Sequence, residues 1–110
     1  MVGKHLSVKV IENSLIARMA AVKLGARSTA LAFGNKIHLY GASKEEFLKH
    51  PNWVCHELVH VKQYRQHGFF NFLFKYFIES ARNGYYHNKY EQEARAGEKD
   101  HSILNDFVIV

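Results

Sequence analysis

The most informative segment of the chain is Trp53-Val54-Cys55-His56-Glu57-Leu58-Val59-His60-Val61. On a helix, His56 and His60 lie one turn apart and about 40° apart around the axis, so both imidazoles point to the same side. The opposite side carries apolar residues, Val54, Leu58 and Val61. Burying two histidines and a glutamate without partners is unfavourable by several kcal/mol, so this pattern predicts a polar site on a helix that packs on a core.

The spacing of the two histidines predicts a metal site. Both imidazoles of a His-x-x-x-His pair reach one Zn²⁺ at about 2.0–2.1 Å. Glu57, about 100° around the helix from His56, flanks the metal and is placed to move a proton from an activated water to a leaving amine. A chain of this composition contains about 0.04 His-Glu-x-x-His motifs by chance. We therefore interpret His56 and His60 as zinc ligands and Glu57 as the catalytic base; the alternative is two satisfied histidines on a half-exposed helix.

Turn and cap signals place short elements before the motif helix. We expect a helix over 12–24 stopped by Gly25, strands over 29–33 and 36–40 joined by Gly34-Asn35, and a short helix capped by Ser43 and Glu46. The motif helix then runs from about Pro51 or Asn52 to Gln66, with Gly68 as its stop.

Further helices follow the motif helix. We expect an aromatic helix over 69–82 closed by Asn83-Gly84, a last helix over about 88–104, and an apolar tail over 107–110. This order predicts an α+β fold, mostly helical and zincin-like, with a small β-hairpin or sheet beside the His-Glu-x-x-His helix.

Length and composition limit the class of protein. The 110 residues, 47% of them hydrophobic, suffice for one domain over 1–110 with a modest core. The single cysteine, Cys55, cannot form an internal disulfide, and no apolar run reaches the about 18 residues of a membrane span. Residues 1–10 lack the apolar core of a signal peptide. We therefore expect a soluble, cytoplasmic domain.

The basic charge does not predict a nucleic-acid partner. The formal net charge of +5 comes from the first 50 residues, where eight lysines and arginines face three glutamates. These side chains are scattered singly and are not interleaved with aromatic residues, as in an RNA-binding sheet. We interpret them as a solvated face and expect no specific nucleic acid.

A catalytic zinc site needs a third protein ligand. His67 shares the face of His60 but lies about 10 Å further along the axis, and a cap at the helix C-terminus is its simpler role. Glu91 and Glu93 are better candidates. On the predicted last helix, Glu93 falls on a packing stripe, with Tyr86, Tyr90 and Gly97, and Glu91 falls on a polar one, with His87, Arg95 and Glu98.

His56-Glu57-Leu58-Val59-His60, followed by Gln63 and later by Tyr90-Glu91-Gln92-Glu93-Ala94, resembles the gluzincin class of zinc metallopeptidases, in particular small bacterial stand-alone domains. The resemblance covers about residues 29–97. It implies Zn²⁺ as the cofactor, with His56, His60 and Glu91 as ligands and Glu57 as the base; Glu93 is the alternative third ligand. Many relatives have an Asp four residues after this glutamate, which orients a ligating histidine. This chain has Arg95 there, which is able to pair with Glu91 and compete with the metal.

The resemblance also implies groups around the metal. Gluzincins stabilise the oxyanion with a His or Tyr across the cleft, and Tyr85, Tyr86 and His87 are candidates, with packing as the alternative role of the tyrosines. Gln63 is a candidate to hydrogen-bond at the metal site. The strand over 36–40 is expected to pair with an extended substrate.

The segment 69–78 is unusually aromatic and too short to span a bilayer. Three roles are open: a core helix that covers the motif helix, a hydrophobic specificity wall or a surface for a second copy or partner protein, and peripheral membrane contact.

These patterns predict a zinc-dependent metallopeptidase that hydrolyses peptide bonds in a peptide or protein substrate. The alternative is a non-catalytic zinc-binding or protein-interaction domain that retains the metallopeptidase fold, since 110 residues hold no second lobe to deepen a cleft.

Overall fold

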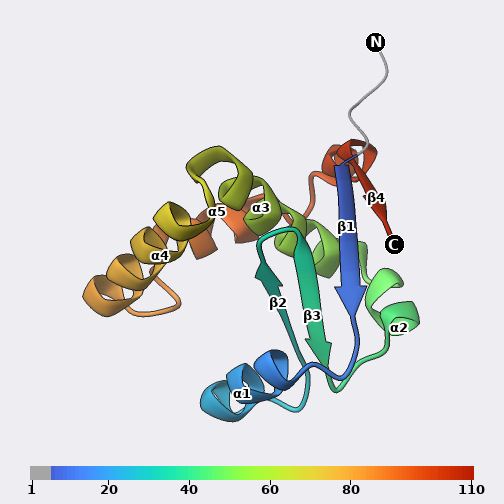
Figure 1. The fold of residues 1–110 in the computed structure, drawn as a ribbon, viewed down its shortest axis with the longest axis horizontal. Helices are drawn as coiled ribbons and strands as arrows, with labels where there is room; N and C mark the ends of the chain where they lie inside the picture. Colours follow the sequence, from blue (N-terminus) through green and yellow to red (C-terminus); the bar gives the residue numbers. More distant parts are fainter. Residues whose placement is uncertain (1–5) are drawn as a thin grey trace.

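The computed structural model describes residues 6–110 and confirms the α+β class. Residues 1–5, part of the segment for which we expect no signal peptide, lie outside the described residues. The elements follow in the order β1 Leu6–Ile11, α1 Leu15–Leu24, β2 Thr29–Phe33, β3 Lys36–Tyr40, α2 Lys44–Leu48, α3 Pro51–His67, α4 Phe69–Asn83, α5 Lys89–Ala96, the 3₁₀ helix η1 His101–Asp106 and β4 Phe107–Ile109 (Figure 1).

The four strands form one mixed sheet in the order β2-β3-β1-β4. The hairpin β2–β3 is antiparallel and closes at the pair Phe33–Lys36, as the Gly34-Asn35 turn predicts. The terminal strands were not among the expected elements. β1 pairs in parallel with both β3 and β4, and Figure 1 shows β4 beside β1 at the far side of the sheet from β2.

The core lies between this sheet and α3. Val8, Ile37 and Leu39 from the strands are fully buried, as is Leu58 from α3. Val54 and Val61 are buried on the same side of α3, which confirms the apolar face that the sequence indicates. This packing fixes the rotation of α3 about its axis and turns His56 and His60 away from the core.

Most helix ends follow their predicted caps. Ser43 and Glu46 make both bonds of the capping box, Pro51 stands in the first turn of α3, and Gly68 ends that helix. The first helix begins later than predicted, at Leu15 instead of residue 12, because Ser14 caps it.

The predicted last helix over 88–104 is wrong in its second half. α5 ends at Ala96, and Gly97 follows as its cap. Glycine has a low helix propensity, and Asp100 then caps a separate 3₁₀ helix through its bond from the Ser102 amide. The apolar tail after this helix becomes β4.

The aromatic helix α4 covers the α3–α5 pair with one face only. Phe72 is buried in a cluster with Tyr64 and Tyr90, whereas Phe70 is 81% exposed and Phe74 67% exposed. The role of α4 as a cover for the motif helix is therefore confirmed for its inner face. Within residues 6–110, no helix combines the length and the apolar character that crossing a membrane requires.

The turn at Gly41 provides a test of the fold. Its φ is +79°, and a Cβ there would lie 2.2 Å from the Arg27 carbonyl oxygen, where the chain between α1 and β2 passes the end of β3. We expect Gly41→Ala to lower the free energy of unfolding by about 3 kcal/mol or more, because a backbone clash adds to the left-handed strain.

The matched control is Gly25→Ala. Gly25 has a similar φ of +67° with no atom within 4 Å of the added Cβ, so only the conformational penalty of about 1–2 kcal/mol is expected. Urea unfolding of both variants measures the difference. Equal losses for the two would contradict the close approach at Gly41.

Candidate metal centre

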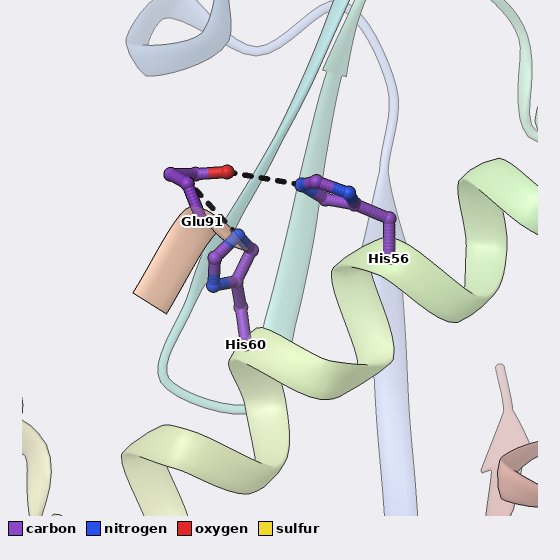
Figure 2. Close-up of side chains that lie close together, drawn as sticks. All are labelled: His56, His60 and Glu91. Atoms are coloured by element: carbon purple, nitrogen blue, oxygen red, sulfur yellow. Dashed lines mark hydrogen bonds and ion pairs between the residues drawn. The ribbon is translucent and has the colours of Figure 1, made fainter. Parts of the chain in front are cut away.

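Two helices bring the candidate site together. His56 and His60 project from successive turns of α3, and Figure 2 shows their rings directed at the carboxylate of Glu91, which comes from α5. One ligand atom of each residue lies within 4.8 Å of the others. His56 Nε2 is 3.0 Å from Glu91 Oε1, and His60 Nε2 is 3.2 Å from Glu91 Oε2. The two predicted histidines and one of the two predicted glutamates therefore converge on one point.

The start of α5 is held by Asn88, which is fully buried. Its Oδ1 accepts a hydrogen bond from the Tyr90 amide at 2.8 Å and so caps the helix. Its Nδ2 donates to the Tyr76 carbonyl oxygen and to Ser80 Oγ, both on α4. Glu91, in the first turn of α5, is thereby fixed relative to α4 as well as α3.

The outward nitrogens of both histidines are engaged. His56 Nδ1 donates to Glu98 Oε2 at 2.8 Å, and His60 Nδ1 donates to Gln63 Oε1 at 2.8 Å, since a carboxylate or amide oxygen only accepts. Without metal, His56 Nε2 also donates, to Glu91 Oε1 at 3.0 Å, so this ring is protonated on both nitrogens. In the neutral form of each ring, a proton held on Nδ1 would leave the lone pair of Nε2 free for a metal. Metal-ligating histidines in proteins are oriented in the same way.

The chemistry of the donor set fits a divalent metal. His60 Nε2 is buried and makes no hydrogen bond within residues 6–110, although Glu91 Oε2 lies nearby, because the approach lacks hydrogen-bond geometry. A buried ring nitrogen of this kind needs a partner. Two imidazoles and a carboxylate are a ligand set that Zn²⁺ accepts, and the residues present therefore fit the ion.

Two residues at the site were missed by sequence reasoning. Tyr76 of α4 donates its hydroxyl proton to Glu91 Oε2, and Glu98 supports His56. Glu98 lies past the end of α5 at Ala96, so its position beside His56 depends on the turn at Gly97, and helical spacing from Glu91 does not account for it. Tyr76 sits in an aromatic run that is interpreted as packing, so its hydroxyl gave no separate signal.

Gln63 and Glu93 form a second layer behind His60. Gln63, whose side chain bonds to His60, also donates from Nε2 to the Tyr90 carbonyl oxygen at 3.2 Å and to Glu93 Oε1 at 2.5 Å. Glu93 thus contacts the amide that orients a histidine and does not reach the point where the histidines meet. The structure therefore brings Glu91 to the histidines, and not its alternative.

Arg95 does not pair with Glu91 as the sequence suggested. Its guanidinium lies 4.1 Å from the ring centroid of Tyr86 and donates to the Tyr86 carbonyl oxygen. Tyr86 is 65% exposed and packs edge-to-face with His87, which is also exposed. Both residues are therefore held outside the cleft, and Tyr85 is the member of this group that lines it.

His67 is likewise remote from the site. Its ring stacks on Phe72 with centroids 5.9 Å apart, and its Nδ1 lies 3.4 Å from Lys75 Nζ. This position at the end of α3 agrees with a structural role.

Burial and charge set the protonation of the site. Burial raises the pKa of Glu57 to about 7, with the charge of Glu91 adding to the rise and the histidines opposing it. Burial lowers the pKa of His56, but the hydrogen bond to Glu91 and the charge of Glu57 outweigh it and raise the value to about 9. Burial raises the pKa of Glu91, but the hydrogen bond from His56 and the nearby charge of His60 outweigh it and hold this pKa well below the ordinary range.

A cleft of about 400 Å³ opens onto these residues. Its floor includes His56, Glu57, His60 and Glu91, and the whole of β2 runs along one side. The strand over 36–40, which we expected to pair with a substrate, lies inside the sheet between β2 and β1, so that expectation is wrong. Among the described residues β2 pairs only with β3, and it is the edge strand beside the site.

Comparison with known proteins gives one match. The family model described as the eCIS core domain matches residues 3–68, which is more than half of the chain. The matched segment includes His56, Glu57 and His60 and ends before α4 and α5 begin. No curated protein and no solved structure matches the chain. The likeness to gluzincins therefore stays a prediction.

The pKa of His56 predicts how zinc affects stability at different pH. Without metal, the protonated His56 contributes stability that is fully present below its ordinary pKa of 6.5 and is lost as pH rises through about 9. Zinc binds the neutral ring and must displace this proton, so its binding strengthens as pH rises. We expect the rise in Tm caused by zinc to grow between pH 6.5 and pH 9.

Thermal unfolding with Zn²⁺ and with a chelator, across that pH range, measures this effect. A rise in Tm that is constant with pH, or that is larger at the acidic end, would contradict the assignment of His56 as a ligand.

The support of His56 by Glu98 predicts a second result. We expect Glu98→Ala to weaken Zn²⁺ affinity about tenfold or more, because the ring loses the acceptor that fixes its tautomer. Arg95→Ala, at the position that many gluzincins use for this purpose, serves as the control and is expected to leave affinity unchanged. Competition titration with a chromophoric chelator measures both. The reverse order of effects would show that Glu98 does not orient the ligand.

Proposed function

We propose that the chain, which belongs to the eCIS core domain family, is a zinc-dependent metallopeptidase domain that hydrolyses peptide bonds. The family description does not name a reaction, and the proposal rests on the site. The observation that carries it is the convergence of His56, His60 and Glu91 within 4.8 Å, next to the buried carboxylate of Glu57 and on the floor of an open cleft.

His56, His60 and Glu91 are the residues that would hold the zinc. When bound, zinc supplies a Lewis acid that polarises a carbonyl group and lowers the pKa of water. The protein's part is to orient the ligands through Glu98 and Gln63, whose bonds to the two Nδ1 atoms are already formed.

Glu57 is proposed to carry the proton. It neighbours both ligating histidines in sequence and space but is not a member of the converging set. Its pKa of about 7 suits a group that accepts a proton from water near neutral pH and returns it to the leaving amine. The backbone of Ala32 on β2 acts to lower the pKa of this carboxylate, which lies beside the edge strand.

Tyr85 is proposed to stabilise the oxyanion. It lines the cleft, and burial together with the charge of Glu91 raises its pKa, so that its hydroxyl stays protonated and can donate. Tyr85 is one of three candidates that the sequence offered for this role, and the other two, Tyr86 and His87, do not line the cleft.

β2 is proposed to position the substrate backbone. In a two-residue hairpin the closing pair exchanges both hydrogen bonds, so bonding alternates, and Ala30 and Ala32 turn their amide groups to the free edge. The Ala32 amide lies near the Glu57 carboxylate, and the backbone groups of Ala30 are available to an added strand.

Substitution of Glu57 tests the catalytic step. We expect Glu57→Gln to lower hydrolysis by about 10²–10⁴-fold, because the amide cannot accept a proton, while the protein still binds about one zinc. Glu45→Gln, an exposed glutamate on α2, makes the same chemical change outside the site and is expected to leave hydrolysis unchanged. Mass spectrometry of an unstructured peptide library gives cleavage, and elemental analysis gives zinc content.

Substitution of a ligand separates metal binding from catalysis. We expect His60→Ala to lose both zinc and hydrolysis, with near-normal folding checked by circular dichroism. If the unaltered chain binds zinc but cuts no peptide, and Glu57→Gln changes nothing measurable, the protein is instead a zinc-binding interaction domain.

A further inference from the structure

The cleft beside the metal centre has two apolar walls. One comes from α1, where Ile16, Ala20 and Leu24 line the cleft. The other comes from α4, through Leu73 and Phe77. Figure 1 shows β2 as the outermost strand, with α1 next to the start of this strand and α4 beyond its outer edge. Because residues of α1, β2 and α4 all line the cleft, an occupant lying along β2 would meet apolar side chains from both helices.

These wall residues are exposed to solvent. Phe77 is 63% exposed, Leu24 51% and Ile16 41%. Single exposed apolar residues are ordinary, but here they gather along one cleft that leads to the candidate site, and a gathered patch of this kind marks a binding surface. The walls are continuous with the site, so an occupant that covers them also reaches His56 and Glu57.

Positive and negative side chains occupy different parts of the cleft. Among the described residues that line it, Lys23 is the only lysine or arginine, and it stands on the α1 wall next to Leu24. The carboxylates of the lining, Glu57 and Glu91, lie on the floor, with the histidines. The rim on the α1 side therefore favours an anionic group, whereas the walls favour apolar ones.

We infer that the cleft binds an extended polypeptide segment with large apolar side chains and with an acidic side chain where the segment passes α1. This inference rests on the proposed peptidase function and names its substrate class. An extended backbone matches the free edge of β2, the apolar side chains match Leu24 and Phe77, and the acidic side chain matches Lys23.

A peptide series tests each part of the match. The reference is a fluorescent peptide rich in Leu and Phe with one Glu, bound to the zinc-loaded Glu57→Gln variant, which does not cut it. We expect about tenfold weaker binding for each Leu or Phe replaced by Ser, because a wall contact is lost. Two further peptides carry N-methyl groups on alternate residues, one at the odd positions and one at the even positions. We expect only one of the two to lose binding, because an added strand uses every second amide for its hydrogen bonds to β2. Fluorescence anisotropy measures the affinities.

Reversal of one charge tests the acidic preference. The acidic preference is the ratio of the affinity for the Glu peptide to the affinity for a matching peptide with Lys in place of Glu. We expect Lys23→Glu to lower this ratio about threefold or more. Lys75→Glu, on α4 beside His67 and outside the cleft lining, makes the same change in net charge and is the control. Equal shifts in the two variants would show a general charge effect and overturn the role of Lys23.

The readouts separate this inference from the proposed function. Peptide binding with the expected preferences, but no cleavage by the unaltered chain, would overturn the peptidase function and support the cleft specificity. Cleavage of polar and apolar peptides at equal rates would support the peptidase function and overturn the specificity. If sedimentation shows a dimer that the reference peptide does not dissociate, the walls bind a second copy and the inferred substrate class is wrong.

Discussion

The meeting of the Glu91 carboxylate with His56 and His60 is the contact on which the arrangement of α3, α4 and α5 depends. All three residues are mostly buried, and a buried charge is tolerated only when it is paired and hydrogen-bonded. The structure meets this requirement with groups from each helix: Gln63 from α3, Tyr76 from α4, and the capped first turn of α5. The aromatic helix is therefore a support of the site as well as a cover for the core.

The same helix serves the core and the site because its two faces differ. Val54, Leu58 and Val61 bind α3 to the sheet, and this packing places Glu57 against the edge strand β2. Residues 6–110 thereby bring a candidate proton carrier, candidate metal ligands and the edge strand β2 together at one cleft. The apolar walls of this cleft come from α1 and α4, so the inferred selectivity for a substrate would depend on side chains of these two helices.

Local signals predicted much of the fold. The Gly34-Asn35 hairpin and the Ser43–Glu46 capping box depend on residues within a few positions of one another, and both are confirmed. The parallel pairing of β1 with β4 was missed because it joins the two ends of the chain, and no local pattern encodes it. At the site, helical periodicity favoured Glu91, but the support from Tyr76 depends on how α4 packs and could not be read from spacing.

The proposed peptidase function requires that His56, His60 and Glu91 hold one zinc ion on the floor of the cleft. A crystal structure of the zinc-loaded protein, with anomalous data collected on both sides of the zinc absorption edge, would show whether they do. We expect one anomalous peak per chain, bonded to the Nε2 atoms of both imidazoles and to the Glu91 carboxylate, with Glu57 beside it and unbonded. A zinc-free site with the two rings turned apart, or zinc held by Glu93 in place of Glu91, would contradict it.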